Sequence, residues 1–329
     1  MKAIREIIDA AEELASLRGP VQIVVAAAQD DAVLAAVEAA RREGIARAVL
    51  IGDREAIARI AEAEGIDLSN YEVVHEKDLA KAASSAVAHV RNGEALLVMK
   101  GLLETSVLLK AVLNKETGLN AGRLISHVGV LESPYYHKLF LVTDAAINIA
   151  PTLAEKLDII RNAVDCARAI GVELPKVALL AAVEKVNAEK MPCTADAAIL
   201  TQMNRRGQIP FCIIDGPLAL DNAVSMEAAR IKKIDSPVAG DADILVAPDI
   251  EAGNILYKAL LDMGGAKGAG LVCGAKAPII LTSRADSAQT KLASIALGIL
   301  AALGMPDRRS DPAASSDVKP APGGQTKAG

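Results

Sequence analysis

A serine, an arginine and an aspartate follow an apolar segment near the end of the chain, in LTSRADS (residues 281–287). Residues 279–282 are strand-like, and a helix is expected from Ser283 to about Leu303. Ser283 and Asp286 fit a capping box, with Ser283 as N-cap and Asp286 at N3. Arg284, beside free N–H groups at a positive helix end, could also bind phosphate. The segment therefore predicts an anion site, with Thr282 at the strand end as a further binding candidate.

A second strand is followed by a lysine and a glycine, in KGLLETS (residues 100–106). Lys100 follows a predicted strand, Gly101 permits close backbone approach, and Thr105 lies in the first turns of the next helix. A lysine at the end of a buried strand contributes little to packing, so we favour a binding role for Lys100. Lys110 lies further along that helix, where it could face the same site or be solvated.

Strand, polar turn and helix recur in SPVAGDADILVAPDIEAGNILY (residues 236–257). Residues 244–247 read as a buried strand that ends on Pro248-Asp249. Asn254 lies in the turn that opens an apolar-periodic helix at residues 255–261. In open α/β sheets, ligands gather at the carboxyl ends of the strands. A carboxylate and an amide beside exposed helix N–H groups make Asp249 and Asn254 candidates for a polar pocket.

The remaining reactive residue types form no recognised motif. No metal-ligand spacing relates the four histidines His75, His89, His127 and His137. The four cysteines are far apart without a C-x-x-C pair, so reduced thiols are expected. P-loop, G-x-S-x-G and H-E-x-x-H sequences are also absent. The glycine run at residues 264–270 precedes a strand, whereas a dinucleotide loop follows one, so we interpret it as a flexible hinge.

Strand-like and helical segments alternate through the first 114 residues, at roughly 20–25 residues per unit, which predicts a parallel sheet with right-handed crossovers. Residues 118–122 interrupt this rhythm. Two strands at residues 123–130 and 139–143 then share a short connection, so they are expected to be antiparallel neighbours beside a domain boundary. A second α/β series follows, including one helix over residues 217–232. The tail from residue 306 is polar and rich in Pro and Gly, and is expected to be disordered.

Composition narrows the class of protein. The chain has 329 residues, which favours two domains or one large α/β domain. A hydrophobic content of 52% with only 2% aromatics suits strands buried beneath helices on both faces. The net charge of −5 gives no overall attraction to nucleic acid. No apolar run approaches the ~20 residues that span a bilayer, and the first segment lacks a signal peptide's apolar region, so a cytoplasmic location is expected.

From residue 100 to about residue 300 the sequence resembles the phosphate acetyl/butyryltransferase family, and it is most similar to the phosphate butyryltransferase branch. The stretches that carry the resemblance keep their order and are MKGLLETSVLLKAVLN, RLISHV, LFLVTDAAINIAP, DGPLALDNAVS, SPVAGDADILVAPDIEAGN and PIILTSRADS. The resemblance implies a reversible transfer in which butyryl-CoA and phosphate give butyryl phosphate and CoA. It implies coenzyme A and phosphate as substrates, with no metal and no bound cofactor.

The resemblance also implies a two-domain α/β fold like that of isocitrate dehydrogenase, with mostly parallel sheets and the site in an interdomain cleft. Domain I would combine residues 1–121 with 271–305, and domain II would span residues 122–270. Domain II would form the contacts of a homodimer or higher homo-oligomer. Residues 306–329 would be a disordered tail.

The family's Ser-Arg pair falls on Ser283 and Arg284. Thr290 stands where acetyl-transferring relatives carry the aspartate proposed as base, and Lys110 stands where they carry an arginine. Because of these two differences the sequence does not identify the catalytic base, and Asp286 is the nearest carboxylate that could replace the missing aspartate. We hypothesise that Arg284 and the helix N-terminus stabilise the thiolate or the phosphate while Asp286 orients Arg284. Ser283 would donate to the developing oxyanion or to the phosphate.

Three other functions remain alternatives on the sequence alone. A phosphate acetyltransferase uses the same chemistry, and an extra methylene in a pocket is worth only ~1 kcal/mol or a little more. A dehydrogenase on the same fold is disfavoured, because neither a dinucleotide loop nor a cluster of metal-binding aspartates is found. A non-catalytic protein that binds CoA or acyl phosphate would agree with Thr290 and Lys110.

Overall fold

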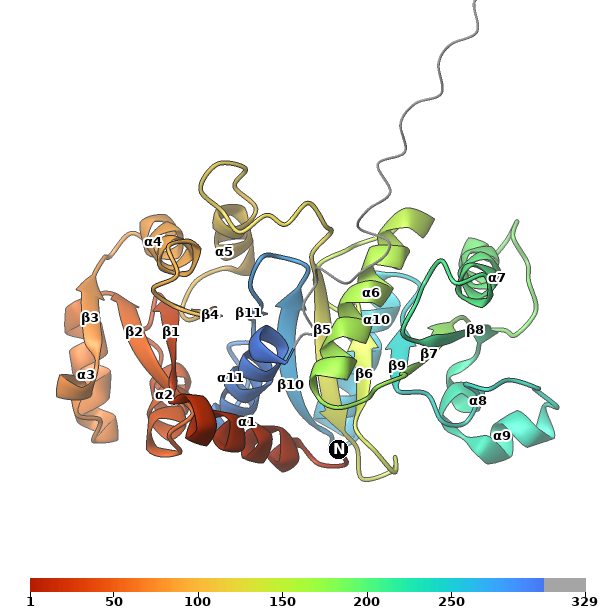
Figure 1. Cartoon of the computed structure of the whole chain (residues 1–329), viewed down its shortest axis with the longest axis horizontal. Coiled ribbons are helices and arrows are strands. Elements are labelled where there is room, and N and C mark those ends of the chain that lie inside the picture. The colour runs from red at the N-terminus through yellow and green to blue at the C-terminus, as the bar shows by residue number, and fades with distance from the viewer. Residues whose placement is uncertain (305–329) are drawn as a thin grey trace, which may run out of the picture.

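The computed structural model describes residues 1–304, which form an eleven-stranded sheet running across the longest dimension of the molecule (Figure 1). The order of the strands is β3-β2-β1-β4-β11-β10-β5-β6-β9-β7-β8. Their bounds are β1 Val21–Ala26, β2 Ala46–Gly52, β3 Glu72–His75, β4 Leu97–Lys100, β5 Ser126–Glu132, β6 Phe140–Thr143, β7 Lys176–Leu180, β8 Ile213–Leu218, β9 Ile244–Val246, β10 Lys267–Cys273 and β11 Ile279–Ile280. The predicted α/β class with a mostly parallel sheet is confirmed.

Helices connect the strands and cover the sheet. They are α1 Ile4–Arg18, α2 Asp31–Arg42, α3 Arg54–Glu64, α4 Leu79–Arg91, α5 Thr105–Val112, α6 Leu153–Ala169, α7 Pro192–Arg205, α8 Leu220–Val224, α9 Met226–Ile231, α10 Ile250–Lys258 and α11 Ala288–Leu303, with the 3₁₀ turn η1 Leu68–Asn70 and the π turn η2 Ala259–Met263. No helix in this part of the chain has the length and apolar character needed to cross a membrane.

Two parallel groups of strands form the ends of the sheet. At one end, β3, β2, β1, β4 and β11 pair in parallel, and at the other end β6, β9, β7 and β8 do the same. In the middle, β10 pairs antiparallel with both β11 and β5, and β5 pairs antiparallel with β6. The predicted antiparallel neighbours are therefore β5 and β6. The central strands join both ends into one continuous sheet.

The prediction of a flexible hinge at residues 264–270 is wrong for residues 267–270. Residues 267–270 belong to β10, and Gly268, Ala269 and Gly270 are buried. Ladder hydrogen bonds to β5 order this segment despite its glycines, because the absent side chains leave room for packing from a helix above. The expected boundary between residues 270 and 271 lies inside this strand.

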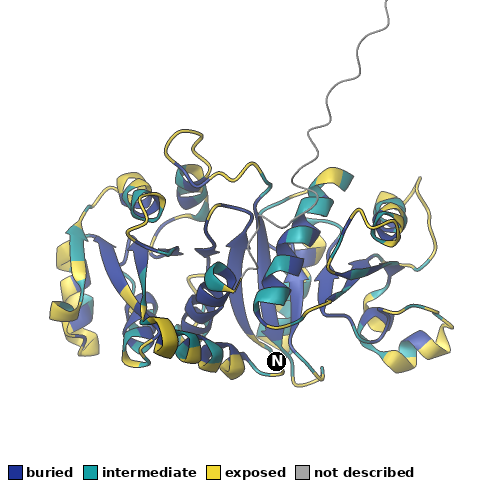
Figure 2. Ribbon diagram, in the orientation of Figure 1, coloured by how far each residue is buried: buried dark blue, intermediate teal, exposed yellow. Residues whose placement is uncertain are grey.

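Helix α11 lies at the centre of the core, where it packs against α1, α2 and β10 (Figure 2). Every residue from Lys291 to Ala301 is buried, including Leu297 and Ile299. A helix that is apolar on all sides requires such burial. Helix α11 thus fills the space beneath the central strands and fixes the turn that precedes it.

Three helix boundaries differ from the sequence predictions. Helix α11 begins at Ala288 rather than Ser283, because the side chain of Ser287 provides the N-cap. Helix α10 begins at Ile250, five residues earlier than expected, after Asp249 caps it. The helix expected over residues 217–232 is split into α8 and α9, since β8 runs to Leu218 and Ser225 starts a new N-cap. The predicted disordered tail at residues 306–329 lies outside the described residues.

A buried glutamate connects α2 to the edge of the sheet. Glu38 is 6% exposed, and its carboxylate accepts hydrogen bonds from Arg41 and Arg42 on its own helix. Its third partner is the hydroxyl of Tyr71, which lies 2.6 Å away and directly precedes β3. Hydrogen bonds from Arg41, followed by those from Tyr71 and Arg42, lower the pKa of Glu38 from 4.5 to about 2 against the effect of burial.

This lowered pKa predicts a loss of stability in acid. The network should contribute fully above the unfolded-state pKa and disappear as the pH falls from about 5 to about 2. We expect Glu38→Gln to lower the free energy of unfolding by about 2–3 kcal/mol at pH 7, with the difference from wild type vanishing near pH 2. Urea unfolding at a series of pH values measures this, with Glu62→Gln on the exposed face of α3 as control. A difference independent of pH would contradict the assignment.

Candidate functional site

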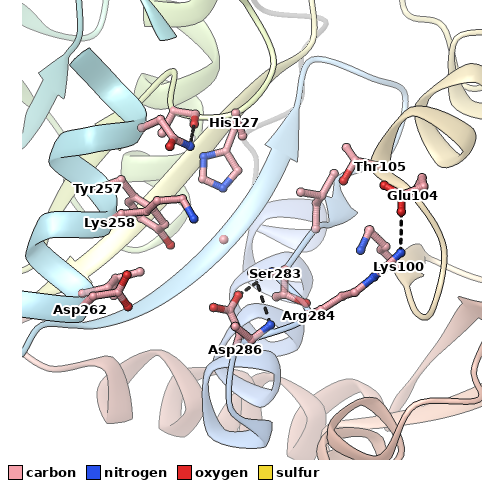
Figure 3. Close-up of a pocket in the computed structure, with 18 of the residues that line it drawn as sticks. Lys100, Glu104, Thr105, His127, Tyr257, Lys258, Asp262, Ser283, Arg284 and Asp286 are labelled. Carbon is pink, nitrogen blue, oxygen red and sulfur yellow. Dashed lines mark hydrogen bonds and ion pairs between the residues drawn. The ribbon is translucent and has the colours of Figure 1, made fainter. Parts of the chain in front are cut away.

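A cavity of about 500 Å³ opens in the middle of the sheet, beyond the carboxyl ends of β4 and β11. One wall consists of the turn from β4 into α5 and the turn at residues 282–286. The facing wall consists of β5, the loop at residues 145–146 and α10 with η2 (Figure 3). Segments from the start, middle and end of the chain therefore meet around one space.

The turn that carries Ser283 is a structure of its own before α11. The backbone N–H of Ser283 donates to a carboxylate oxygen of Asp286 at 2.6 Å, and the N–H of Ala285 approaches the Ser283 hydroxyl at 3.3 Å. The capping box is thus wrong in part: Asp286 accepts the expected N–H, but Ser283 does not cap the helix. The hydroxyl of Ser283 is exposed at the cavity.

A buried lysine holds this turn from below. Lys291, on the first turns of α11, is only 2% exposed. Its ammonium donates to the backbone carbonyl oxygens of Asp286 at 2.5 Å and Ser283 at 3.2 Å. A buried cation needs such partners, so the position of the turn is coupled to the packing of α11.

The turn between β4 and α5 brings a second cation to the cavity. Lys100 is 6% exposed, and burial, then the nearby Arg284, lowers its pKa, while Glu104 and Asp30 oppose the shift. Gly101 is the first residue of this turn, where a Cβ would overlap the carbonyl oxygens of Ala26 and Ala27 at the end of β1. The glycine therefore allows two backbone segments to approach each other and sets the height of Lys100 at the cavity edge.

Helix α5 begins without a side-chain cap. Glu104 is its N-cap residue but makes no side-chain cap hydrogen bond, because its carboxylate accepts from Arg284 at 2.7 Å instead (Figure 3). Arg284 was expected to be oriented by Asp286; the structure places Glu104 beside it and Asp286 on the Ser283 N–H. Both members of the pair are exposed, so solvent screens it and a substrate anion can compete for Arg284.

Helix α10 supplies the facing wall. The side-chain amide of Asn254 donates to the carbonyl of Ala145 at 2.8 Å, which ties α10 to the loop after β6. Tyr257, Lys258 and Asp262 follow along the same side and line the cavity. Asp249 lies at the start of this helix, where its carboxylate accepts the N–H of Ala252.

The structure brings most of the predicted residues together. The predicted residues that line the cavity are Lys100, Thr105, Asn254, Thr282, Ser283, Arg284 and Asp286. Gly101 does not line the cavity and instead packs against the backbone of Ala26 and Ala27. Asp249 caps α10 and Lys110 is exposed on α5, and neither lines the cavity. Within residues 1–304, no group of three or more His, Cys, Asp or Glu side chains is placed to hold a metal ion.

Several residues of the cavity were missed, and those with polar side chains are Glu104, His127, Tyr257, Lys258 and Asp262. His127 on β5 is 5% exposed, and Tyr257 on α10 packs against it with 5.5 Å between ring centroids at an angle of 81°. Burial lowers the pKa of His127, opposed by Asp144 and Asp286, and burial raises the pKa of Tyr257. A polar ring inside the apolar segment RLISHV was the available signal for His127.

The arrangement suits an anionic substrate with a polar reacting group. Lys100, Arg284 and the open start of α5 provide positive potential at one side. Ser283 provides a hydroxyl at the edge of this region, while His127 and Tyr257 provide neutral polar groups at the facing wall.

The chain is similar to several known proteins. A family model described as phosphate acetyl/butaryl transferase matches residues 4–84 and 75–299. The chain is 50% identical over 281 residues to the phosphate butyryltransferase of Clostridium acetobutylicum, covering 85% of this chain and 93% of that protein. It is 47% identical to the phosphate acetyltransferase of Thermotoga maritima, covering 84% and 93%. The crystal structure of a branched-chain phosphotransacylase from Enterococcus faecalis superposes with a TM-score of 0.77 at 35% identity, covering 86% and 99%.

The close packing at Gly101 yields a prediction about stability. Gly101→Ala should lower the free energy of unfolding by about 1–3 kcal/mol, because rigid backbone atoms of Ala26 and Ala27 occupy the position of the new Cβ. Gly268→Ala is the matched control, since its Cβ would meet movable methyl groups of Leu131 and Leu261 at 3.2 Å. Urea unfolding compares the two, and an equal or smaller loss for Gly101→Ala would refute the packing argument.

Proposed function

Because this chain belongs to the phosphate acetyl/butaryl transferase family, we propose that it transfers a short acyl group reversibly between coenzyme A and inorganic phosphate. The preferred reaction is that of a phosphate butyryltransferase, in which butyryl-CoA and phosphate give butyryl phosphate and CoA. The observation that carries this proposal is the meeting of Lys100, Arg284 and Ser283 around one cavity in a chain 50% identical to a phosphate butyryltransferase.

Inorganic phosphate would bind between the two turns of the first wall. Arg284 can offer two parallel N–H donors to phosphate, and the ammonium of Lys100 adds a second positive charge. The N-terminus of α5 has no side-chain cap, and its first N–H groups form the positive end of the helix dipole. Phosphate would take the place of the Glu104 carboxylate on Arg284, since both anions suit the same guanidinium.

The thioester would lie across the cavity, with its carbonyl carbon near the bound phosphate. Coenzyme A leaves as a thiolate, and a thiol of pKa about 8.5 needs only modest stabilisation near neutral pH. Ser283 would donate to the developing oxyanion or to the phosphate. Asp286 would act mainly by accepting the Ser283 N–H at 2.6 Å, which holds the serine hydroxyl at the cavity.

Acetyl transfer is the second candidate, favoured by the 47% identity to a phosphate acetyltransferase. A cavity of about 500 Å³ accommodates either acyl group. Each additional methylene changes binding by only about 1–3 kcal/mol, so one site can accept both substrates with different efficiency.

Domain organisation and assembly extend the proposal. We propose the division into residues 1–121 with 271–305 and residues 122–270, with the cavity between them, and a homodimer formed through the second domain. Large apolar side chains exposed on that part support a partner surface, namely Val186, Ile199, Phe211, Met226 and Ile231. Light scattering after gel filtration tests the dimer. The four free cysteines suit a cytoplasmic location, which we also propose.

The activity predicts phosphate-dependent release of CoA. The protein should release CoA from butyryl-CoA only when phosphate is present, and more slowly from acetyl-CoA. A thiol reagent follows the release, with assays lacking phosphate as the control. Faster release from acetyl-CoA would favour the acetyltransferase, release without phosphate would indicate hydrolysis, and no release with either substrate would contradict the proposal.

The phosphate site predicts a selective effect of Arg284→Lys. We expect the KM for phosphate to rise at least 10-fold while the KM for butyryl-CoA changes little, because lysine loses the bidentate fork. Steady-state kinetics with each substrate varied in turn measures this. Arg206→Lys, at the exposed C-terminal end of α7, is the matched control. An unchanged KM for phosphate would remove Arg284 from the phosphate site.

A further inference from the structure

Three glycines on neighbouring strands create the space that Tyr257 occupies. A Cβ on Gly129 of β5 would overlap the Tyr257 ring, and a Cβ on Gly268 of β10 would lie 3.4 Å from its hydroxyl oxygen. A Cβ on Gly270 would lie 4.0 Å from that oxygen. The ring is thereby seated against the sheet, and its hydroxyl is directed along β10 toward the cavity (Figure 3).

His127 reaches the same place from β5. A Cβ on Gly270 would lie 3.2 Å from its Nε2 atom, so this nitrogen and the Tyr257 hydroxyl both lie near the position that this Cβ would occupy. Its Nδ1 atom is buried and has no hydrogen-bond partner among residues 1–304. An orphaned acceptor is tolerated better than an orphaned N–H, which places the proton of the neutral ring on Nε2.

Both groups are neutral donors near physiological pH. Burial lowers the pKa of His127, which keeps the ring uncharged. Burial, then the charge of Asp286, raises the pKa of Tyr257 and keeps its hydroxyl protonated. Both groups lie across the cavity from the turn that carries Ser283, and the negative charge of Asp286 on that turn raises the pKa of each (Figure 3). Among residues 1–304, neither the Tyr257 hydroxyl nor Nε2 of His127 makes a hydrogen bond, and both residues line the cavity.

We infer that Nε2–H of His127 and the hydroxyl of Tyr257 together donate to the carbonyl oxygen of the acyl group and stabilise the oxyanion of the tetrahedral intermediate. This inference rests on the proposed acyl transfer. It assigns the oxyanion to the α10 wall and leaves Ser283 to the phosphate at the opposite wall. A preorganised pair of donors in a buried site is the arrangement that such charge development requires.

The step can be written without a further reactant. An oxygen of phosphate attacks the carbonyl carbon of the thioester, and the C=O π electrons move to the carbonyl oxygen, which gains a full negative charge. The two donors shorten their hydrogen bonds to that oxygen without giving up their protons. The C=O bond then re-forms, the C–S bond breaks, and its electron pair leaves with sulfur as the CoA thiolate.

Neutral donors suit a position beside the acyl carbonyl, because that oxygen is uncharged in the substrate and becomes charged only in the transition state. His127 and Tyr257 gain most of their interaction only when charge develops on the carbonyl oxygen, and such differential binding raises kcat.

Tyr257→Phe tests the inference with the ring packing preserved. We expect kcat to fall about 10²-fold in the forward direction, from butyryl-CoA and phosphate, and in the reverse direction, from butyryl phosphate and CoA. The KM for phosphate should stay within about twofold of wild type. Tyr136→Phe is the matched control, because Tyr136 is also half-buried but its hydroxyl donates to the carbonyl of Ala242 at 2.8 Å outside the cavity. Circular dichroism and thermal unfolding establish that each variant is folded.

A pair of substitutions at His127 tests the second donor. His127→Leu removes the donor and should lower kcat about 10²-fold, whereas His127→Gln can place an amide N–H near the Nε2 position and should recover most of the activity. Loss of a merely structural ring would affect both variants alike. The double variant Tyr257→Phe with His127→Leu should lose less than the product of the single losses, because both donors serve one oxygen.

The outcomes separate this inference from the proposed function. If wild type shows phosphate-dependent release and both single variants keep kcat within twofold, the oxyanion assignment is wrong and the acyl transfer stands. If the variants change only the ratio of KM for butyryl-CoA to that for acetyl-CoA, the two side chains line the acyl pocket instead. If wild type releases no CoA, the proposed function and this inference fail together.

Discussion

The antiparallel pairing of β10 with both β5 and β11 is the constraint on which the rest of the structure depends. Without β10 the two parallel groups of strands would be separate sheets, and the two walls of the cavity would have no fixed relation. Glycines at 268 and 270 let this strand pass beneath Tyr257 while its ladder hydrogen bonds remain intact. Residues 267–270, predicted to be part of a flexible hinge, therefore form a buried strand beside the site.

A second constraint lies under the turn at residues 283–286. Helix α11 is buried on all sides, so its position follows from the core rather than from the site. The ammonium of Lys291, on this helix, donates hydrogen bonds to two backbone carbonyls of the turn and so fixes the turn relative to the helix. Leaving this cation unpaired inside the protein would be costly, so the turn and the helix are held together. The backbone that carries Ser283 and Arg284 is therefore held by the packing of α11, although both residues are exposed.

The sequence predicted the parts of the site that depend on local pattern. Polar residues at strand ends, such as Lys100 and Ser283, could be found because carboxyl ends of parallel strands gather at one place. His127 and Tyr257 could not be recognised in this way, since each lies in an apolar segment. Their role depends on glycines of other strands, which only tertiary packing brings together. The start of α11 was misplaced for a related reason: both Ser283 and Ser287 are good caps locally, and the buried Lys291 favours the later one.

The distribution of charge across the cavity gives the two walls different tasks. Lys100 and Arg284 lie on the wall that would receive phosphate, where attraction in the ground state is useful. His127 and Tyr257 lie on the facing wall, where burial keeps both groups uncharged and where the exposed Lys258 also lines the cavity. Because a hydrogen bond to an ionised acceptor is about twice as strong as one to a neutral acceptor, neutral donors strengthen their contact as the carbonyl oxygen becomes an oxyanion. Charged groups would thus hold the substrate, and uncharged groups would lower the barrier.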